Sequence, residues 1–148
     1  KESLYKVLDA GPLVFNHNVE TVKRLQRSIR SGATYERSLS VLKMAAEYGD
    51  GSIKVKTGIM LGLGETMEQV QQTLRDLRAH DVDMITVGQY LQPTPHHHPV
   101  MRYWTPEEFA EIEAYGNQLG FTHVASGPMV RSSYHADRMA MDAGFVEA

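Results

Sequence analysis

The sequence predicts an α/β fold built on a parallel sheet, and three observations support this prediction. Short apolar runs alternate with amphipathic stretches along the 148 residues. The apolar runs have the length of strands that are buried on both faces. Helix-capping sequences open two of the amphipathic stretches. Strands that alternate with helices are typical of parallel βαβ units, so we expect one all-parallel sheet.

The expected elements follow one another without repeats, linkers or low-complexity segments. In chain order they are a helix tail at 4–8, a strand at 13–16, a helix at 19–29, a helix with its apolar face at 39–46 that ends at 49–51, a strand at 53–61, a helix that begins after Thr66 with its buried face at 70–77, a strand at 84–87, a helix at 105–119 and a strand at 123–126.

Apolar spacing, capping residues and glycines justify the helices. Apolar side chains recur every three or four positions in each of them, as at Val19, Val22, Leu25 and Ile29. Glycines end them, at 32, 49 and 120. Thr66 with Gln69, and Thr105 with Glu108, form capping boxes at the last two helix starts, and Pro106 follows the second cap.

Composition narrows the classes of function. The 42% hydrophobic and 22% charged content is that of an ordinary globular domain, and a net charge of −3 gives no footprint for nucleic acid or an anionic membrane. No apolar run is long enough to span a bilayer, and the N-terminus lacks a signal-peptide core, so we expect a cytoplasmic protein. The absence of an initiator Met suggests a piece that begins inside a domain. Because the chain has no Cys, it offers no disulfide, thiolate ligand or Cys nucleophile.

An all-parallel sheet binds its ligand at the carboxyl ends of its strands, which nominates the loops at 17–20, 62–65, 89–93 and 127–135. The first is either a plain turn or a site. Gly62 and Gly64 permit either tight packing or a close ligand, whereas Glu65 would repel phosphate. The loop at 127–135 continues into a dense polar run, residues 131–137, which is costly to bury without partners, so we favour a site there over a solvated loop.

Two further patterns have plainer interpretations. Three consecutive histidines, His96 to His98, point in different directions from a proline-flanked loop and are expected to be solvent-exposed rather than to bind metal. Methionines are expected to fill the core, namely Met60, Met84, Met129, Met139 and Met141.

These segments together resemble a known family. In this order, VFNHNVET, YERSL, KTGIMLGLGET, DLRAHDVDMITVGQYLQPTPHHHPV, RYWTPEEF and GFTHVASGPMVRSSYHAD are similar to the C-terminal half of the lipoyl synthases, which are radical S-adenosylmethionine (SAM) enzymes. The resemblance implies a partial TIM-like barrel, with residues 1–148 as the C-terminal half of one domain. It also implies that the N-terminal half, which carries the cluster-binding cysteines of this family, would be absent from the chain.

The resemblance also implies a transferase reaction, the radical insertion of two sulfur atoms into an octanoyl group for lipoate biosynthesis. Its cofactors would be SAM and two 4Fe–4S clusters, and its partners an octanoylated lipoyl-carrier protein or domain and an electron donor. No catalytic side chain is assigned, and we expect the chain alone to be inactive. The alternatives are another radical SAM enzyme, or a cysteine-free half-barrel that binds a ligand without catalysis.

The family's site residues carry over by position. SAM contacts are implied for Asn16, Asn18, Glu20, Arg37, Gly62, Gly64, Glu65, Gln89, Tyr90 and Leu91, of which the last three would act through backbone groups. Ser133 is implied as a ligand of the auxiliary cluster, with Ser132 as the alternative and Arg131 and Tyr134 as near neighbours.

Overall fold

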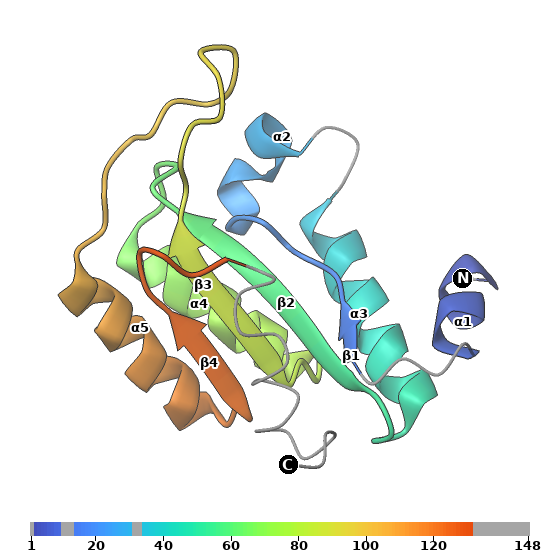
Figure 1. Ribbon diagram of the computed structural model, residues 1–148. Coiled ribbons are helices and arrows are strands. Elements are labelled where there is room, and N and C mark those ends of the chain that lie inside the picture. Colours follow the sequence, from blue (N-terminus) through green and yellow to red (C-terminus); the bar gives the residue numbers. More distant parts are fainter. Residues whose placement is uncertain (1, 10–13, 31–33, 132–148) are drawn as a thin grey trace.

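The computed structural model describes residues 2–9, 14–30 and 34–131, which form a parallel sheet with helices packed on it (Figure 1). Its elements are α1 (Glu2–Asp9), β1 (Val14–Asn16), the 3-10 turn η1 (Lys23–Leu25), α2 (Gln26–Ile29), α3 (Tyr35–Gly49), β2 (Lys54–Leu61), α4 (Met67–Ala79), β3 (Met84–Gln89), α5 (Pro106–Leu119) and β4 (His123–Ser126).

The four strands pair in the order β1-β2-β3-β4, and every pair is parallel. Each strand therefore lies beside the next one in the sequence. Because βα-crossovers are right-handed, this order places the connecting helices on the same face of the sheet. Figure 1 shows α4 behind the sheet, between α3 and α5. The predicted all-parallel α/β fold is confirmed.

The two faces of the sheet differ in chemistry. Toward the helices, β2 and β3 present apolar side chains such as Val55, Ile59 and Ile85, which are at most 3% exposed and form the core. The other residues of β2 and β3, which alternate with these along each strand, face the opposite side of the sheet. Several of them are small or polar. The paired residues Gly58↔Thr86 and Met60↔Gly88 lie on this second face. Lack of bulk there leaves room for a ligand.

Most element boundaries agree with the prediction. Both capping boxes are present, at Thr66 with Gln69 and at Thr105 with Glu108. Gly120 ends α5 in a left-handed conformation with φ of 95°. The third strand continues two residues beyond the predicted end, to Gln89.

The helix predicted over residues 19–29 is wrong in its first part. Helical structure begins only at Lys23, as one 3-10 turn followed by the short α2. Glu20 instead continues the pairing with β2: its N–H donates to Gly58 O at 3.0 Å, and its carbonyl accepts from Met60 N at 2.8 Å. Val19 and Val22 are buried, and the backbone at Val22 is extended, so their helical spacing is misleading.

The methionine prediction holds for Met84, which is fully buried. Met129 is 76% exposed, because it lies in the turn after β4 at the rim of the sheet, and the prediction is wrong there. Met139 and Met141 lie outside the described residues.

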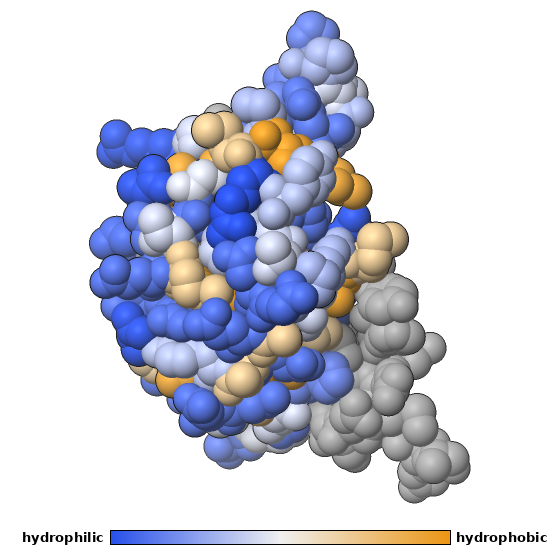
Figure 2. All heavy atoms as spheres, turned by 90° about the vertical axis from the view of Figure 1, so that its left-hand side faces the viewer, coloured by the Kyte–Doolittle hydropathy of each residue, from blue (hydrophilic) through white to orange (hydrophobic). Residues whose placement is uncertain are grey.

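The outer surface is polar on the side occupied by α5. Figure 2 shows this side as mainly hydrophilic, with scattered hydrophobic atoms. Within the described part of the chain, no helix has the length and hydrophobicity needed to cross a membrane.

Candidate functional site

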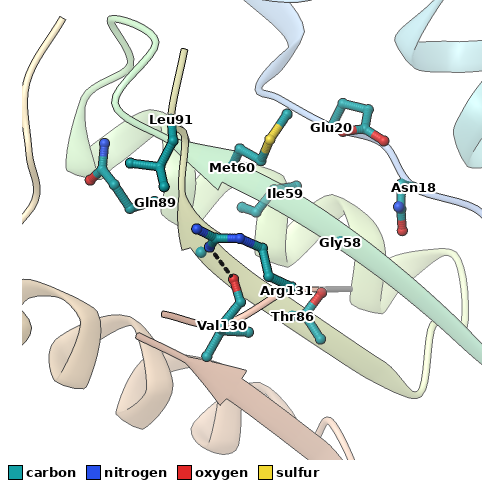
Figure 3. A pocket seen from close by; sticks show the side chains of 11 residues that line it. Asn18, Glu20, Gly58, Ile59, Met60, Thr86, Gln89, Leu91, Val130 and Arg131 are labelled. Carbon is teal, nitrogen blue, oxygen red and sulfur yellow. Dashed lines mark hydrogen bonds between the residues drawn. The ribbon is translucent and has the colours of Figure 1, made fainter. Parts of the chain in front are cut away.

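A hollow of about 250 Å³ lies on the face of the sheet that the helices leave free (Figure 3). Asn18 and Glu20 line it from the segment after β1, Gly58 and Met60 from β2, and Thr86 and Gly88 from β3. Its wall is completed by Ile59, Gln89, Leu91, Val130 and Arg131. The hollow thus lies toward the carboxyl ends of the strands, where the parallel topology predicts a ligand.

Glu20 has an unusual backbone conformation at the edge of this hollow. Its φ is 76°, in the left-handed region that non-glycine residues disfavour. Such a conformation costs on the order of 1–3 kcal/mol and persists where surrounding contacts enforce it, often at functional sites. Here the pairing with β2 enforces it and leaves the half-buried Glu20 residue in the lining of the hollow.

Asn18 offers an unsatisfied acceptor to the same hollow. Its Oδ1 is buried and has no hydrogen-bond partner among the described residues. Gly58 lies opposite: a Cβ there would be 3.1 Å from Asn18 Oδ1 and 2.8 Å from Thr86 Oγ1. An orphan buried acceptor beside a residue without a side chain suits a ligand that donates a hydrogen bond.

Gly88 was not singled out by the sequence analysis, yet it shapes the other wall. A Cβ on Gly88 would collide with the carbonyl oxygen of Val130, so only glycine lets the segment after β4 pack against β3. That contact brings Arg131 into the lining of the hollow. Figure 3 shows its guanidinium group over the strands, where Nη1 donates to Val130 O at 2.8 Å. A glycine inside a strand is the signal that could have identified this close approach.

The loop from Gly62 to Glu65 lies outside the hollow. The Glu65 carboxylate accepts hydrogen bonds from backbone N–H groups of this same loop. Glu65 is 6% exposed and accepts hydrogen bonds from Gly62 N at 2.9 Å and Leu63 N at 3.2 Å. It also accepts from Trp104 Nε1 at 3.0 Å. The carboxylate thus occupies the backbone N–H groups that a phosphate would need. It also ties the loop to the long connection between β3 and α5.

The Gln89 side chain reinforces the same connection. Its Nε2 donates to the carbonyls of Tyr90 and Arg102 at 3.0 and 3.1 Å, and its Oε1 accepts from Trp104 N at 3.0 Å. The Gln89 side chain is therefore not free for a ligand, and both backbone groups of Tyr90 are engaged, since its N–H donates to Leu61 O at 2.7 Å. Tyr90 is buried and donates its hydroxyl to His98 O at 2.6 Å. Leu91 is 51% exposed and lines the hollow.

A polar network holds the segment between β1 and α2 from the side of α3. Ser38 Oγ lies 3.2 Å from His17 Nε2 and accepts from Arg30 Nη1 at 2.9 Å. Arg30 Nη1 also donates to Val19 O at 2.9 Å. Burial, and then the positive charge of Arg30, lower the pKa of His17 below its ordinary value of 6.5.

The remaining predicted residues do not line the hollow. Asn16 is exposed at the end of β1, and Arg37 is exposed in the first turn of α3. His96 and His97 are exposed, as expected, but His98 is half-buried, because its ring lies edge-on to that of Tyr90, and the prediction is wrong there. Residues 2–9, 14–30 and 34–131 contain no group of three or more His, Cys, Asp or Glu side chains that could hold a metal ion. Ser132, Ser133 and Tyr134 lie outside the described residues.

Comparison with known proteins gives one family and a set of close relatives. The model of the Radical SAM superfamily matches residues 1–77. The lipoyl synthase of Xanthomonas oryzae pv. oryzae (strain MAFF 311018) is 72% identical over 134 residues, which cover 90% of this chain and 39% of the relative. That of Xylella fastidiosa (strain M23) is 67% identical, with 90% and 35% covered. The chain therefore spans well under half the length of these relatives.

Proposed function

Because the chain belongs to the radical SAM superfamily, whose model matches residues 1–77 of its 148, we propose that it is the C-terminal part of a lipoyl synthase. The observation that carries this proposal is the identity of 72% over 134 residues to a relative of that name. The complete enzyme would insert two sulfur atoms into an octanoyl group held on a lipoyl-carrier protein or domain, using an external electron donor. Residues 1–148 would form the C-terminal part of a single barrel domain in the cytoplasm.

We propose that the hollow on the free face of the sheet binds SAM. The Glu20 carboxylate and Asn18 Oδ1 are acceptors that suit its hydroxyl and amino donors, and Arg131 suits its carboxylate. Backbone groups of Gln89–Leu91 would border the adenine. When bound and reduced, SAM supplies a carbon radical that removes hydrogen atoms from unactivated carbons. The residues of this chain bind and orient it.

Gly62, Gly64 and Glu65 would serve SAM indirectly. They shape the loop that anchors the connection after β3, through hydrogen bonds of Glu65 to Gly62, Leu63 and Trp104. Tyr90 supports the same connection from within. Asn16 and Arg37, both exposed outside the hollow, remain proposed SAM contacts on the resemblance alone.

The iron–sulfur clusters do not fit the side chains of this chain alone. Such clusters depend on Cys thiolates, and the sequence contains none. Their thiolate ligands would come from the remaining part of the complete enzyme. Ser133, with Ser132 as the alternative, remains the proposed protein oxygen ligand of the auxiliary cluster, and Arg131 and Tyr134 remain its proposed neighbours.

The test is to assay the complete enzyme with an octanoylated carrier peptide, measuring 5′-deoxyadenosine and lipoyl product separately. Wild-type enzyme should form both. Ser133→Ala should abolish the lipoyl product and leave 5′-deoxyadenosine largely unchanged, with Ser132→Ala as the matched control. If the wild type forms 5′-deoxyadenosine but never lipoyl product, the chain belongs to another radical SAM enzyme. If it forms neither, the ligand-binding half-barrel without catalysis is the better account.

A further inference from the structure

We propose that Gln26 is a positioning residue: it holds the backbone around Glu20 in its left-handed conformation and thereby aims the Glu20 carboxylate into the hollow. This inference rests on the proposed binding of SAM in the hollow. It assigns a role to a buried polar side chain that does not itself touch the hollow.

Gln26 bonds to the carbonyl groups of the two residues that flank Glu20. It is the first residue of α2 and is only 3% exposed. Its Nε2 donates to Val19 O at 3.0 Å and to Thr21 O at 2.6 Å. These carbonyls belong to the residues immediately before and after Glu20. A side-chain amide has the two N–H donors that this double contact requires.

The orientation of the Gln26 amide is fixed by its other end. Its Oε1 accepts a hydrogen bond from Arg30 Nη1 at 3.1 Å. Because guanidinium groups only donate and carbonyls only accept, the amide must point its nitrogen at Val19 and Thr21. Arg30 adds its own bond to Val19 O at 2.9 Å and so supports the same peptide group.

Glu20 is therefore held from two sides. On one side its own N–H and carbonyl pair with Gly58 O and Met60 N of β2. On the other side Gln26 takes the two neighbouring carbonyls. A φ of 76° is costly for a glutamate, so loss of either support lets the segment relax toward the extended region. Relaxation would turn the carboxylate away from its present place in the hollow.

A merely structural role for Gln26 makes a different prediction. If Gln26 only stabilised the short helical segment η1–α2, its loss would lower the melting temperature without any special dependence on Glu20. A double-mutant cycle separates the two cases, because residues that act through one another show non-additive effects.

The experiment measures SAM affinity by anaerobic calorimetry without reductant, on the complete enzyme carrying its clusters. The variants are Gln26→Met, Glu20→Ala and the double variant, with melting temperature recorded for each. Methionine keeps the length of the side chain and removes the donors. Gln71→Met, on α4 and outside the hollow, is the matched control. Arg30→Met removes the second hydrogen bond to Val19 O and so tests the support of the same carbonyl. It replaces Gln26→Met if that variant does not fold.

We expect Gln26→Met to weaken SAM binding by about tenfold or more in the wild-type background, and by less than about twofold in the Glu20→Ala background. Gln71→Met should leave affinity unchanged. Equal losses in both backgrounds, or a lower melting temperature with unchanged affinity, would overturn the inference. Wild-type enzyme that binds no SAM would overturn the proposed function and the inference with it.

Discussion

Glu20 has a disfavoured backbone conformation and lies at the hollow. A substitution that relieves its backbone strain should therefore stabilise the fold but weaken ligand binding, because it also removes the carboxylate. Glu20→Gly removes the cost of a φ of 76°, whereas Glu20→Ala removes the carboxylate and keeps the cost. Glycine also gains freedom in the unfolded chain, which offsets part of the benefit. We expect the glycine variant to exceed the alanine variant by up to about 1 kcal/mol in the free energy of unfolding.

Both variants should lose SAM affinity in the complete enzyme, measured by calorimetry beside denaturant unfolding. An alanine variant that equals or exceeds the glycine variant in stability would show that the backbone cost at Glu20 is no larger than the entropic cost of glycine. An unchanged affinity in both would remove the carboxylate from the binding site.

The residues of the candidate site were predictable to different degrees. Asn18 and Glu20 follow a short apolar strand, which is only partly buried in the structure, and they match the family's pattern, so the sequence indicated them. Gln26 and Gly88 could not be assigned, because their roles depend on the folded backbone. The role of Gln26 depends on its hydrogen bonds to two backbone carbonyls. The role of Gly88 depends on its close approach to the carbonyl of Val130, which lies 42 positions further along the chain. No local pattern marks such contacts.

At the scale of elements, the loop between β2 and α4 packs against the connection between β3 and α5 and holds it in place. A Cβ on Gly62 would collide with the Gln89 amide and lie 2.6 Å from Arg102 O, at a φ of 104°. A Cβ on Gly64 would have only Met101 Cγ nearby, at 3.8 Å, at a φ of 117°. Gly62→Ala thus adds overpacking to backbone strain, whereas Gly64→Ala adds strain alone.

We therefore expect Gly62→Ala to lower the free energy of unfolding by at least about 1 kcal/mol more than Gly64→Ala does. Denaturant unfolding of the two variants of the complete enzyme measures this difference. Equal losses would mean that the contacts with Gln89 and Arg102 adjust without cost. A larger effect on SAM affinity than on stability would instead return Gly62 to the ligand site.

The contact between His17, in the segment after β1, and Ser38 of α3 should make the stability of the protein depend on pH. Burial and Arg30 lower the pKa of His17 in the folded protein below its unfolded value of 6.5. The unfolded chain therefore binds a proton first as the pH falls. The stability that neutral His17 contributes is complete above pH 6.5 and is lost as the pH drops below it.

We expect the melting temperature of the complete enzyme to fall between pH 7.5 and 5.5, and the fall to be smaller in His17→Gln. Ser38→Ala removes the partner of His17 without removing the titrating group, so it should be less stable at every pH and keep much of the slope. An identical slope in wild type and His17→Gln would contradict the pKa shift.

At the scale of the whole molecule, alternation of strands and helices was enough to predict the parallel sheet. The periodic apolar face of α4 and its capping box were local signals, so this helix was predicted well. The helix predicted over residues 19–22 was wrong, because Glu20 pairs with β2 although the apolar residues around it have helical spacing. The functional face was not predictable as a surface, because it arises from residues of β2 and β3 in register.

The chain by itself should hold no iron–sulfur cluster. Clusters of the 4Fe–4S type depend on Cys thiolates, and the sequence has no Cys. The described part contains no three-residue metal-binding group either. In the described sheet, β1 and β4 each pair with one neighbour only, and such edges promote association. We therefore expect anaerobic reconstitution with iron and sulfide to give far less than four irons per chain, and aggregation at high concentration. A stoichiometric cluster, detected by iron and sulfide analysis, would contradict this prediction.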